Sequence, residues 1–305
     1  MDPAPNVGIL NDNQEELQRK TVSYVQVVTG DLGNKKLPDL PEDISESSMV
    51  LHNGTIFLCG GRYNNLKKCL KLVQGTWREH STLNKERFGH SVVSTQDTIF
   101  VFGGDGISET TYEYLPKDST TWITGNTKTP APFYNGSAIV VKPDQEIWLI
   151  GAQGMDGVDS PSSIISFNVN NHTFQVLPTQ MKVRRDDYKC AFIPKTNKIM
   201  VTGGIAFGYP SNFDATEIIE VEDGSVTMAE PMNSKRCDHG IGVIAINGQE
   251  RLAVMGGENE EKWLDSVEIY NARTEKWETT DMKLKDPSVS FGVLSVKLGT
   301  IISML

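Results

Sequence analysis

The sequence of 305 residues predicts an all-β fold built from a repeated unit of about 50 residues. Three observations support this prediction. A short motif recurs at regular intervals along most of the chain. The composition, with 27 glycines and 14 prolines, is typical of many short strands joined by turns. A strong hairpin signal, Asn53-Gly54, stands between two apolar runs in the first copy of the motif.

The recurring motif is a short apolar run that ends in a glycine pair. Four copies are complete, and a fifth ends in Gly-Ala. The copies read T-I-F-L-C-G-G at 55–61, T-I-F-V-F-G-G at 98–104, E-I-W-L-I-G-A at 146–152, K-I-M-V-T-G-G at 198–204 and R-L-A-V-M-G-G at 251–257. Successive copies start 43, 48, 52 and 53 residues apart. Such a period is typical of repeat folds, in which stacked units bury a continuous core.

Each copy is followed by two bulky apolar residues at a nearly constant spacing. They are seven residues apart in Leu70/Trp77, Phe167/Phe174, Ile219/Val226 and Tyr270/Trp277, and eight apart in Tyr114/Trp122. An apolar run, a glycine pair and then Tyr and Trp at this spacing resemble the kelch motif, and the resemblance covers nearly the whole chain. It implies a β-propeller in which each repeat forms one four-stranded blade. The third copy departs from the family pattern at Ala152, and the fourth lacks both aromatic residues.

The repeats predict six blades. We expect the innermost strands at 49–52, 90–94, 137–141, 188–193, 242–246 and 291–297, and the glycine-terminated runs as second strands. Residues 299–305 (G-T-I-I-S-M-L) align with 54–60 (G-T-I-F-L-C-G), so the sixth blade has its first two strands at the end of the sequence.

Strand-like residues within 21–47 can supply the two outer strands of that blade. We therefore expect a tail at 1–20 and a single domain at 21–305. This domain is an all-β, six-bladed kelch-type propeller whose last blade is closed by strands from both termini, which removes open sheet edges. It leaves no room for the BTB and BACK segments that precede kelch repeats in ubiquitin-ligase adaptors.

Charge and cysteine content narrow the functional classes. The net charge of −10 argues against nucleic acid or an anionic membrane as the partner, and no apolar stretch approaches the roughly 18 residues of a membrane span. The four cysteines, Cys59, Cys69, Cys190 and Cys237, have neither zinc-site nor redox-motif spacing. We expect all four to be reduced, which favours a cytoplasmic location. A secreted, glycosylated protein is an alternative, because N-x-S/T sequons begin at Asn53, Asn135 and Asn171.

The loops that follow second strands and those that precede first strands share one face of a propeller, called here the loop face. Arginines together with aromatic residues are typical of protein-binding hot spots. We expect partner contacts from Arg62, Tyr63, Asn64, Arg87, Tyr134, Arg185, Phe207, Tyr209, Phe213, Arg236 and Trp263. Kelch propellers often use arginines near the strand starts, where this chain has Gly89, Asp187 and Asp238. A partner segment of basic or aromatic character is therefore expected rather than an acidic one.

No catalytic motif stands out. The sequence has no G-x-S-x-G, and the repeated R-x-x-H/Y at 87–90, 185–188 and 236–239 is interpreted as structural. We predict a monomeric, non-catalytic scaffold without cofactor or metal, whose clients by resemblance are actin-linked proteins or substrates of a ubiquitin ligase. The alternative is a kelch-propeller enzyme such as a sugar epimerase, a lyase or an oxidase. An oxidase would need converging side chains such as Cys237, His239 and Tyr209.

Overall fold

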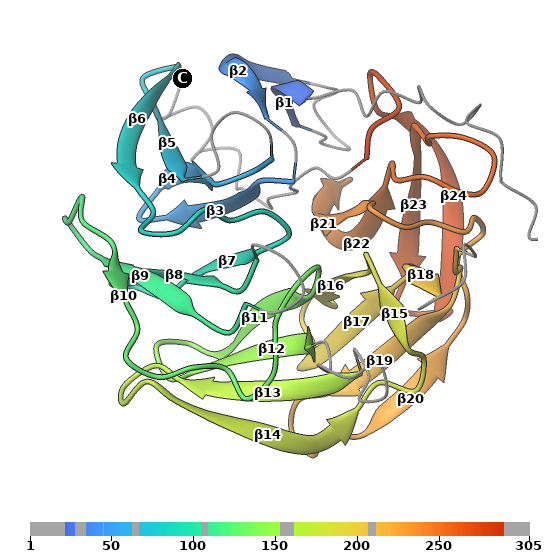
Figure 1. Cartoon of the computed structure of the whole chain (residues 1–305). Helices are drawn as coiled ribbons and strands as arrows, with labels where there is room; N and C mark the ends of the chain where they lie inside the picture. Colours follow the sequence, from blue (N-terminus) through green and yellow to red (C-terminus); the bar gives the residue numbers. More distant parts are fainter. Residues whose placement is uncertain are drawn as a thin grey trace, which may run out of the picture.

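The structure is a computed structural model that describes residues 22–27, 35–44, 46–62, 67–104, 109–152, 162–206 and 212–289. All regular elements in these ranges are β-strands, and five four-stranded antiparallel sheets stand around a common axis (Figure 1). The prediction of an all-β propeller is confirmed. In the same ranges no helix has the length and apolarity that crossing a bilayer requires.

Each blade runs outward from the axis in chain order. The first contains β3 (Ser48–His52), β4 (Thr55–Cys59), β5 (Lys68–Val73) and β6 (Thr76–Thr82), and the second contains β7 (Ser91–Ser94), β8 (Thr98–Phe102), β9 (Tyr112–Pro116) and β10 (Ile123–Thr124). The third contains β11 (Ser137–Lys142), β12 (Glu146–Ala152), β13 (Ser163–Asn168) and β14 (Thr173–Gln180). The fourth contains β16 (Lys189–Phe192), β17 (Lys198–Thr202), β19 (Thr216–Glu220) and β20 (Val226–Ala229), and the fifth contains β21 (Gly240–Ile246), β22 (Gln249–Met255), β23 (Ser266–Asn271) and β24 (Lys276–Lys283). Two short strands, β15 (Arg185–Asp186) and β18 (Ile205–Ala206), pair with each other.

The inner strands β3, β7, β11, β16 and β21 are neighbours around the axis. They match five of the predicted inner strands to within two residues. The hairpin between β3 and β4 has the predicted Asn53-Gly54 turn, with φ values of +48° and +75°. Positive φ at both central residues is the geometry of the tight turns that suit the twist of a hairpin.

The glycine pair of each motif joins one blade to the next. In the second blade Gly104 has a φ of +81°, and a Cβ there would lie 2.9 Å from the carbonyl oxygen of Phe88. The Gly104 N–H donates to the carbonyl oxygen of Phe133 in the third blade at 2.9 Å. Gly61, Gly204 and Gly257 donate in the same way to Arg87, Arg236 and Ser288. Glycine is therefore required by both the backbone angle and the close approach.

The apolar core lies between the blades rather than inside a single sheet. The first two blades share a cluster that includes Val50 and Phe57 from one and Val101 and Trp122 from the other. The indole N–H of Trp122 donates to Ser81 Oγ of the first blade at 2.9 Å. The aromatic residue of the motif thus fills the wide outer gap between blades and satisfies its polar edge there.

The prediction of six blades is wrong for the part of the chain that the structure describes, which holds five. Strands β1 (Val22–Val27) and β2 (Lys35–Ile44) form a two-stranded sheet, which lies beside the first blade in the gap between it and the fifth blade (Figure 1). Leu40 and Ile44 of β2 pack against the first blade, and Trp77 Nε1 donates to the carbonyl oxygen of Pro38 at 3.0 Å. The ranges 291–297 and 299–305, on which the sixth-blade prediction rests, lie outside the described residues, as does the predicted tail at 1–20.

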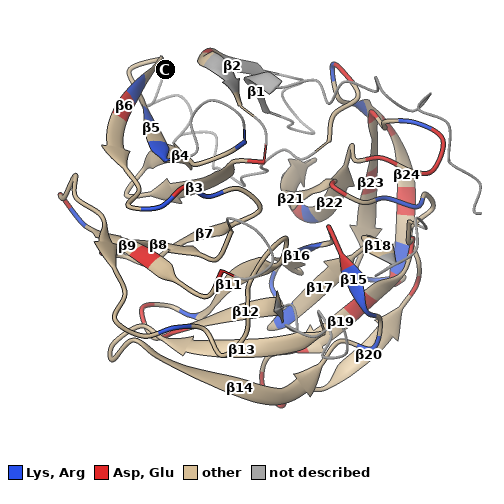
Figure 2. Ribbon diagram, in the orientation of Figure 1, with Lys and Arg blue, Asp and Glu red and all other residues tan. Residues whose placement is uncertain are grey.

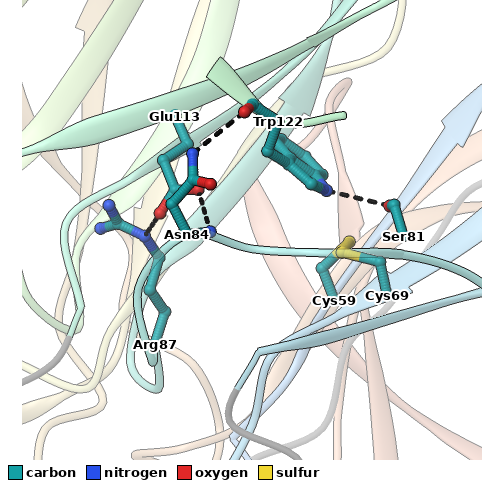
Figure 3. Close-up of a disulfide and its surroundings, with 7 residues drawn as sticks. All are labelled: Cys59, Cys69, Ser81, Asn84, Arg87, Glu113 and Trp122. Carbon is teal, nitrogen blue, oxygen red and sulfur yellow. Dashed lines mark hydrogen bonds and ion pairs between the residues drawn. A yellow bond between two sulfur atoms is a disulfide. The ribbon is translucent and has the colours of Figure 1, made fainter. Parts of the chain in front are cut away.

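Cys59 and Cys69 form a disulfide, which corrects the expectation that all four cysteines are reduced (Figure 3). The two residues lie directly opposite each other on β4 and β5, with Cα atoms 4.1 Å apart. This contact depends on strand register and follows no recognisable spacing motif. Disulfides are typical of oxidising compartments, so the cysteines no longer support a cytoplasmic location. Cys190 and Cys237 are free thiols.

Candidate functional site

Five equivalent turns surround the axis on the loop face, one before each inner strand. Each contains a residue in the left-handed region, two positions before the strand begins: Glu46, Gly89, Asn135, Asp187 and Asp238, with φ values of +52°, +63°, +53°, +53° and +50°. We call these five residues the mouth residues. The N–H of Asn135 donates to Gly89 O at 2.8 Å and that of Asp238 to Asp187 O at 3.0 Å, so neighbouring turns are joined.

The mouth is acidic and surrounds a half-buried tyrosine. Tyr134 precedes a mouth residue and packs edge-on against Phe88, with ring centroids 5.9 Å apart. Burial raises the pKa of Tyr134, and the carboxylates of Glu46, Asp187 and Asp238 raise it further. Three of the five mouth residues are thus carboxylates whose charges act on this phenol.

Arg62 is the one predicted arginine that is partly exposed on this face. Its guanidinium lies 5.0 Å from the centre of the Phe88 ring and pairs with Glu46 at 2.8 Å. The cation therefore already occupies one carboxylate and one aromatic face of the mouth.

A second group of polar side chains lies at the edge of the mouth in the fifth blade. Cys237 is buried, and its thiol faces Glu258 Oε1 at 3.8 Å. Trp263 Nε1 donates to Glu258 Oε2 at 3.1 Å. Burial raises the pKa of the Cys237 thiol well above its ordinary value, and the carboxylates of Asp238 and Glu258 add to that effect. Trp263 is thus half-buried and engaged within its own chain.

Three predicted contact residues, Arg87, Arg185 and Arg236, are corrected by the structure. Each side chain is 0% exposed and turned into its own blade. They form ion pairs with Glu113 (Nε–Oε1 3.0 Å), Glu217 and Glu268 (Nη2–Oε1 2.7 Å), respectively. These glutamates lie on the third strand of each blade, and Figure 2 shows the acidic positions on β9 and β19. Figure 3 shows the pair of Arg87 and Glu113, with Glu113 also accepting from the backbone N–H of Asn84.

The same turns explain the repeated R-x-x-H/Y pattern, whose last residue is buried in all three copies. Burial, followed by the charge of Arg87, lowers the pKa of His90 to about 3. His239 is shifted in the same direction by burial, and the Tyr188 hydroxyl donates to the carbonyl oxygen of Ile150 in the preceding blade. These side chains lie in the interior and do not face the mouth.

Tyr134 and Arg62 are the predicted contacts that the structure brings to the mouth. Phe213 is half-buried beside the turn of Arg236, whose N–H donates to Phe213 O at 3.0 Å. Tyr63, Asn64, Phe207 and Tyr209 lie outside the described residues. The three mouth carboxylates were not among the predicted contact residues. Asp187 and Asp238, each two positions after an arginine of the R-x-x-H/Y pattern, were recognised only as departures from arginine, and Glu46 follows no such arginine.

An open apolar pocket of about 300 Å³ lies among the inner strands. Its walls come from the inner strands of the first four blades and include Leu51, Val93, Ile139 and Phe192.

Fold and site together define a β-propeller with an acidic mouth on its loop face. A family model described as the Kelch motif matches residues 249–280, within the fifth blade. This match and the arrangement of the blades support a kelch-repeat propeller. No curated protein matches the chain. Among 422 matching chains of solved structures, one titled "Structure of YjhT" is similar over 84% of this chain and 88% of that chain, with a TM-score of 0.70 and 12% identity. At this identity the likeness shows the fold alone.

Proposed function

We propose that this protein is a non-catalytic interaction scaffold that binds a basic segment of a partner protein over its acidic mouth. The observation that carries the proposal is that three of the five equivalent mouth residues, Glu46, Asp187 and Asp238, are acidic. Complementary charge is a general means of steering and orienting a partner. The net charge of −10 favours the same class of partner at long range.

The mouth offers two kinds of contact to an arginine or lysine side chain. Carboxylates can accept charge-assisted hydrogen bonds, and the Tyr134 ring can take a cation on its face. Arg62 illustrates the arrangement within the chain itself, because it contacts both Glu46 and Phe88. A partner cation would make the same type of contact with Asp187 and Asp238.

The direct test is a selection from a random peptide library on the immobilised protein, followed by titration of the enriched peptides. We expect enrichment of Lys and Arg and an affinity that falls with added salt. Asp187→Asn with Asp238→Asn should weaken binding by about thirtyfold, since each of the two carboxylates contributes about 1 kcal/mol. Asparagine tolerates the left-handed region, so these turns should keep their shape.

The matched control removes the same charge elsewhere. Glu250 and Asp281 are exposed and distant in sequence from every mouth turn, and Glu250→Gln with Asp281→Asn should leave binding unchanged. Selection of acidic peptides, or equal loss in both double variants, would refute the basic-segment proposal. The client classes suggested by resemblance are then separated by co-sedimentation with actin filaments and by capture of ubiquitin-ligase components.

A further inference from the structure

We propose that Cys237, Asp238 and Glu258 form a binding site for a divalent metal ion of intermediate softness, with Zn²⁺ as the best-suited ion. The sulfur of Cys237 and one carboxylate oxygen from each acidic residue all lie within 4.8 Å of one another. This is the spacing of donor atoms that can turn onto one ion. The proposal is argued from a different set of contacts than the partner proposal above, although the two share Asp238.

Two chain segments bring these donors together. Cys237 and Asp238 belong to the turn that enters the fifth blade, and Glu258 follows the glycine pair at the end of β22. The two segments form a backbone bridge in which Cys237 N–H donates to Glu258 O and Glu258 N–H donates to Cys237 O, both at 3.0 Å. The separation of the donors is therefore set by the backbone.

A neighbouring side chain orients the carboxylate. Trp263 Nε1 donates to Glu258 Oε2 at 3.1 Å, so Oε1 faces the thiol at 3.8 Å. Metal-binding carboxylates are commonly held by such outer hydrogen bonds, which fix their direction and tune their affinity.

The thiol and the charges of the cluster have no other use within the described part of the chain. The Cys237 side chain is 2% exposed, and the one hydrogen-bond partner of its sulfur among the described residues is Glu258. In the same ranges neither Asp238 nor Glu258 has an ion-pair partner. A buried thiol directed at uncompensated carboxylates is a set of donors that a cation would complete.

The donor types select the ion. A sulfur ligand disfavours Mg²⁺ and Ca²⁺, which prefer oxygen ligands in larger number, whereas Zn²⁺ accepts thiolate and carboxylate together. On binding, the sulfur–metal bond forms as the S–H proton passes to solvent. Three protein ligands leave a fourth position to water or to a partner side chain.

Cobalt(II) is a suitable probe, because a cobalt–thiolate bond gives a charge-transfer absorption in the near ultraviolet. We expect the purified chain to develop this band on titration with Co²⁺ and to lose it on addition of Zn²⁺. Cys237→Ser should abolish the band, and Trp263→Phe, which removes the N–H donor, should weaken Co²⁺ binding by about tenfold. Cys190→Ser is the matched control, since Cys190 is the other free thiol, and it should keep the band.

Absence of the band in the wild-type chain, or its persistence in Cys237→Ser, would overturn the proposal. Urea-unfolding midpoints establish that each variant is folded. If Cys237→Ser does not fold, Glu258→Gln replaces it, with the expectation of weaker Co²⁺ binding and an unchanged fold. Equal Co²⁺ affinity in the wild type and Glu258→Gln would also contradict the assignment. Peptide binding is measured separately, so failure of the metal site and failure of the partner proposal are distinguishable.

Discussion

Replacement of Glu268 by glutamine should strongly destabilise the propeller. Glu268 and Arg236 are 1% and 0% exposed, and their side chains lie 2.7 Å apart. Arginine remains protonated in proteins, so Glu268→Gln leaves a buried guanidinium without its counter-charge. The amide also places an N–H₂ group where a carboxylate oxygen accepted either Arg236 or the N–H of Asn233. Breaking a buried pair from one side costs about 3–5 kcal/mol.

The assay is equilibrium unfolding in urea, with Lys235→Ala as the control. Lys235 pairs with Glu260 at 3.1 Å, but both side chains are 46% exposed, so its loss should cost less than about 1 kcal/mol. An effect of Glu268→Gln as small as that of Lys235→Ala would refute the argument that the pair is buried and essential.

The third blade shows that a pair of apolar side chains can replace the buried ion pair of the fifth blade. Phe133 and Ile165 stand where the fifth blade has Arg236 and Glu268, as the hydrogen bonds of the glycine pairs and the strand register show. Both are 0% exposed and share one apolar cluster. The double variant Arg236→Phe with Glu268→Ile should therefore be more stable than Glu268→Gln alone, because two apolar groups leave no buried charge.

Three other measurements test the fold. Because the pKa of His90 is lowered to about 3, the unfolded chain binds the proton more tightly. Stability should be full above pH 6.5 and fall as the pH drops, by about 2 kcal/mol between pH 7 and pH 5; the urea midpoint should depend less on pH in His90→Phe. Thiol titration of the denatured, unreduced chain should find two free thiols, and reduction of the Cys59–Cys69 bond, which closes a loop of 10 residues, should cost about 3 kcal/mol. Gly104→Val should cost more than about 2 kcal/mol, since valine is disfavoured at a φ of +81°. An unchanged melting temperature in this variant would contradict the geometry of the glycine pair.

The positions of the blades could be predicted because each repeat carries its own strand signals. The apolar run, the glycine pair and the bulky residue recur even where one of them is altered, as at Ala152. The number of blades could not be predicted with the same success. The prediction of a sixth blade rested on the alignment of 299–305 with the first repeat. Such an alignment shows that two sequences are similar and does not show where a strand lies in the ring.

The chemistry of the site was harder to predict, because it depends on which way a side chain turns. Arginines in loops are usually exposed, and Arg185 carries no local mark of burial. A signal for the burial of these arginines does exist at longer range in the sequence. Each repeat with an arginine in the turn before its inner strand also has a glutamate in its third strand, such as Glu217. Repeats without the arginine have an apolar residue at that strand position, such as Ile165. The disulfide has no comparable signal, since it follows from register alone.

The turn before each inner strand is fixed by a buried pair of side chains, which is either arginine with glutamate or two apolar residues. This choice of pairs has a consequence for how the sequence of the protein can vary. In the first blade the anchoring positions are Ile44 and Leu70, which share an apolar cluster, whereas the second, fourth and fifth blades use arginine and glutamate. With either kind of pair, the turn places a residue with positive φ at the equivalent mouth position, as at Glu46 in the first blade and Asp238 in the fifth. Natural variation can therefore alter the residues of the mouth one blade at a time without changing the strands that hold them in place.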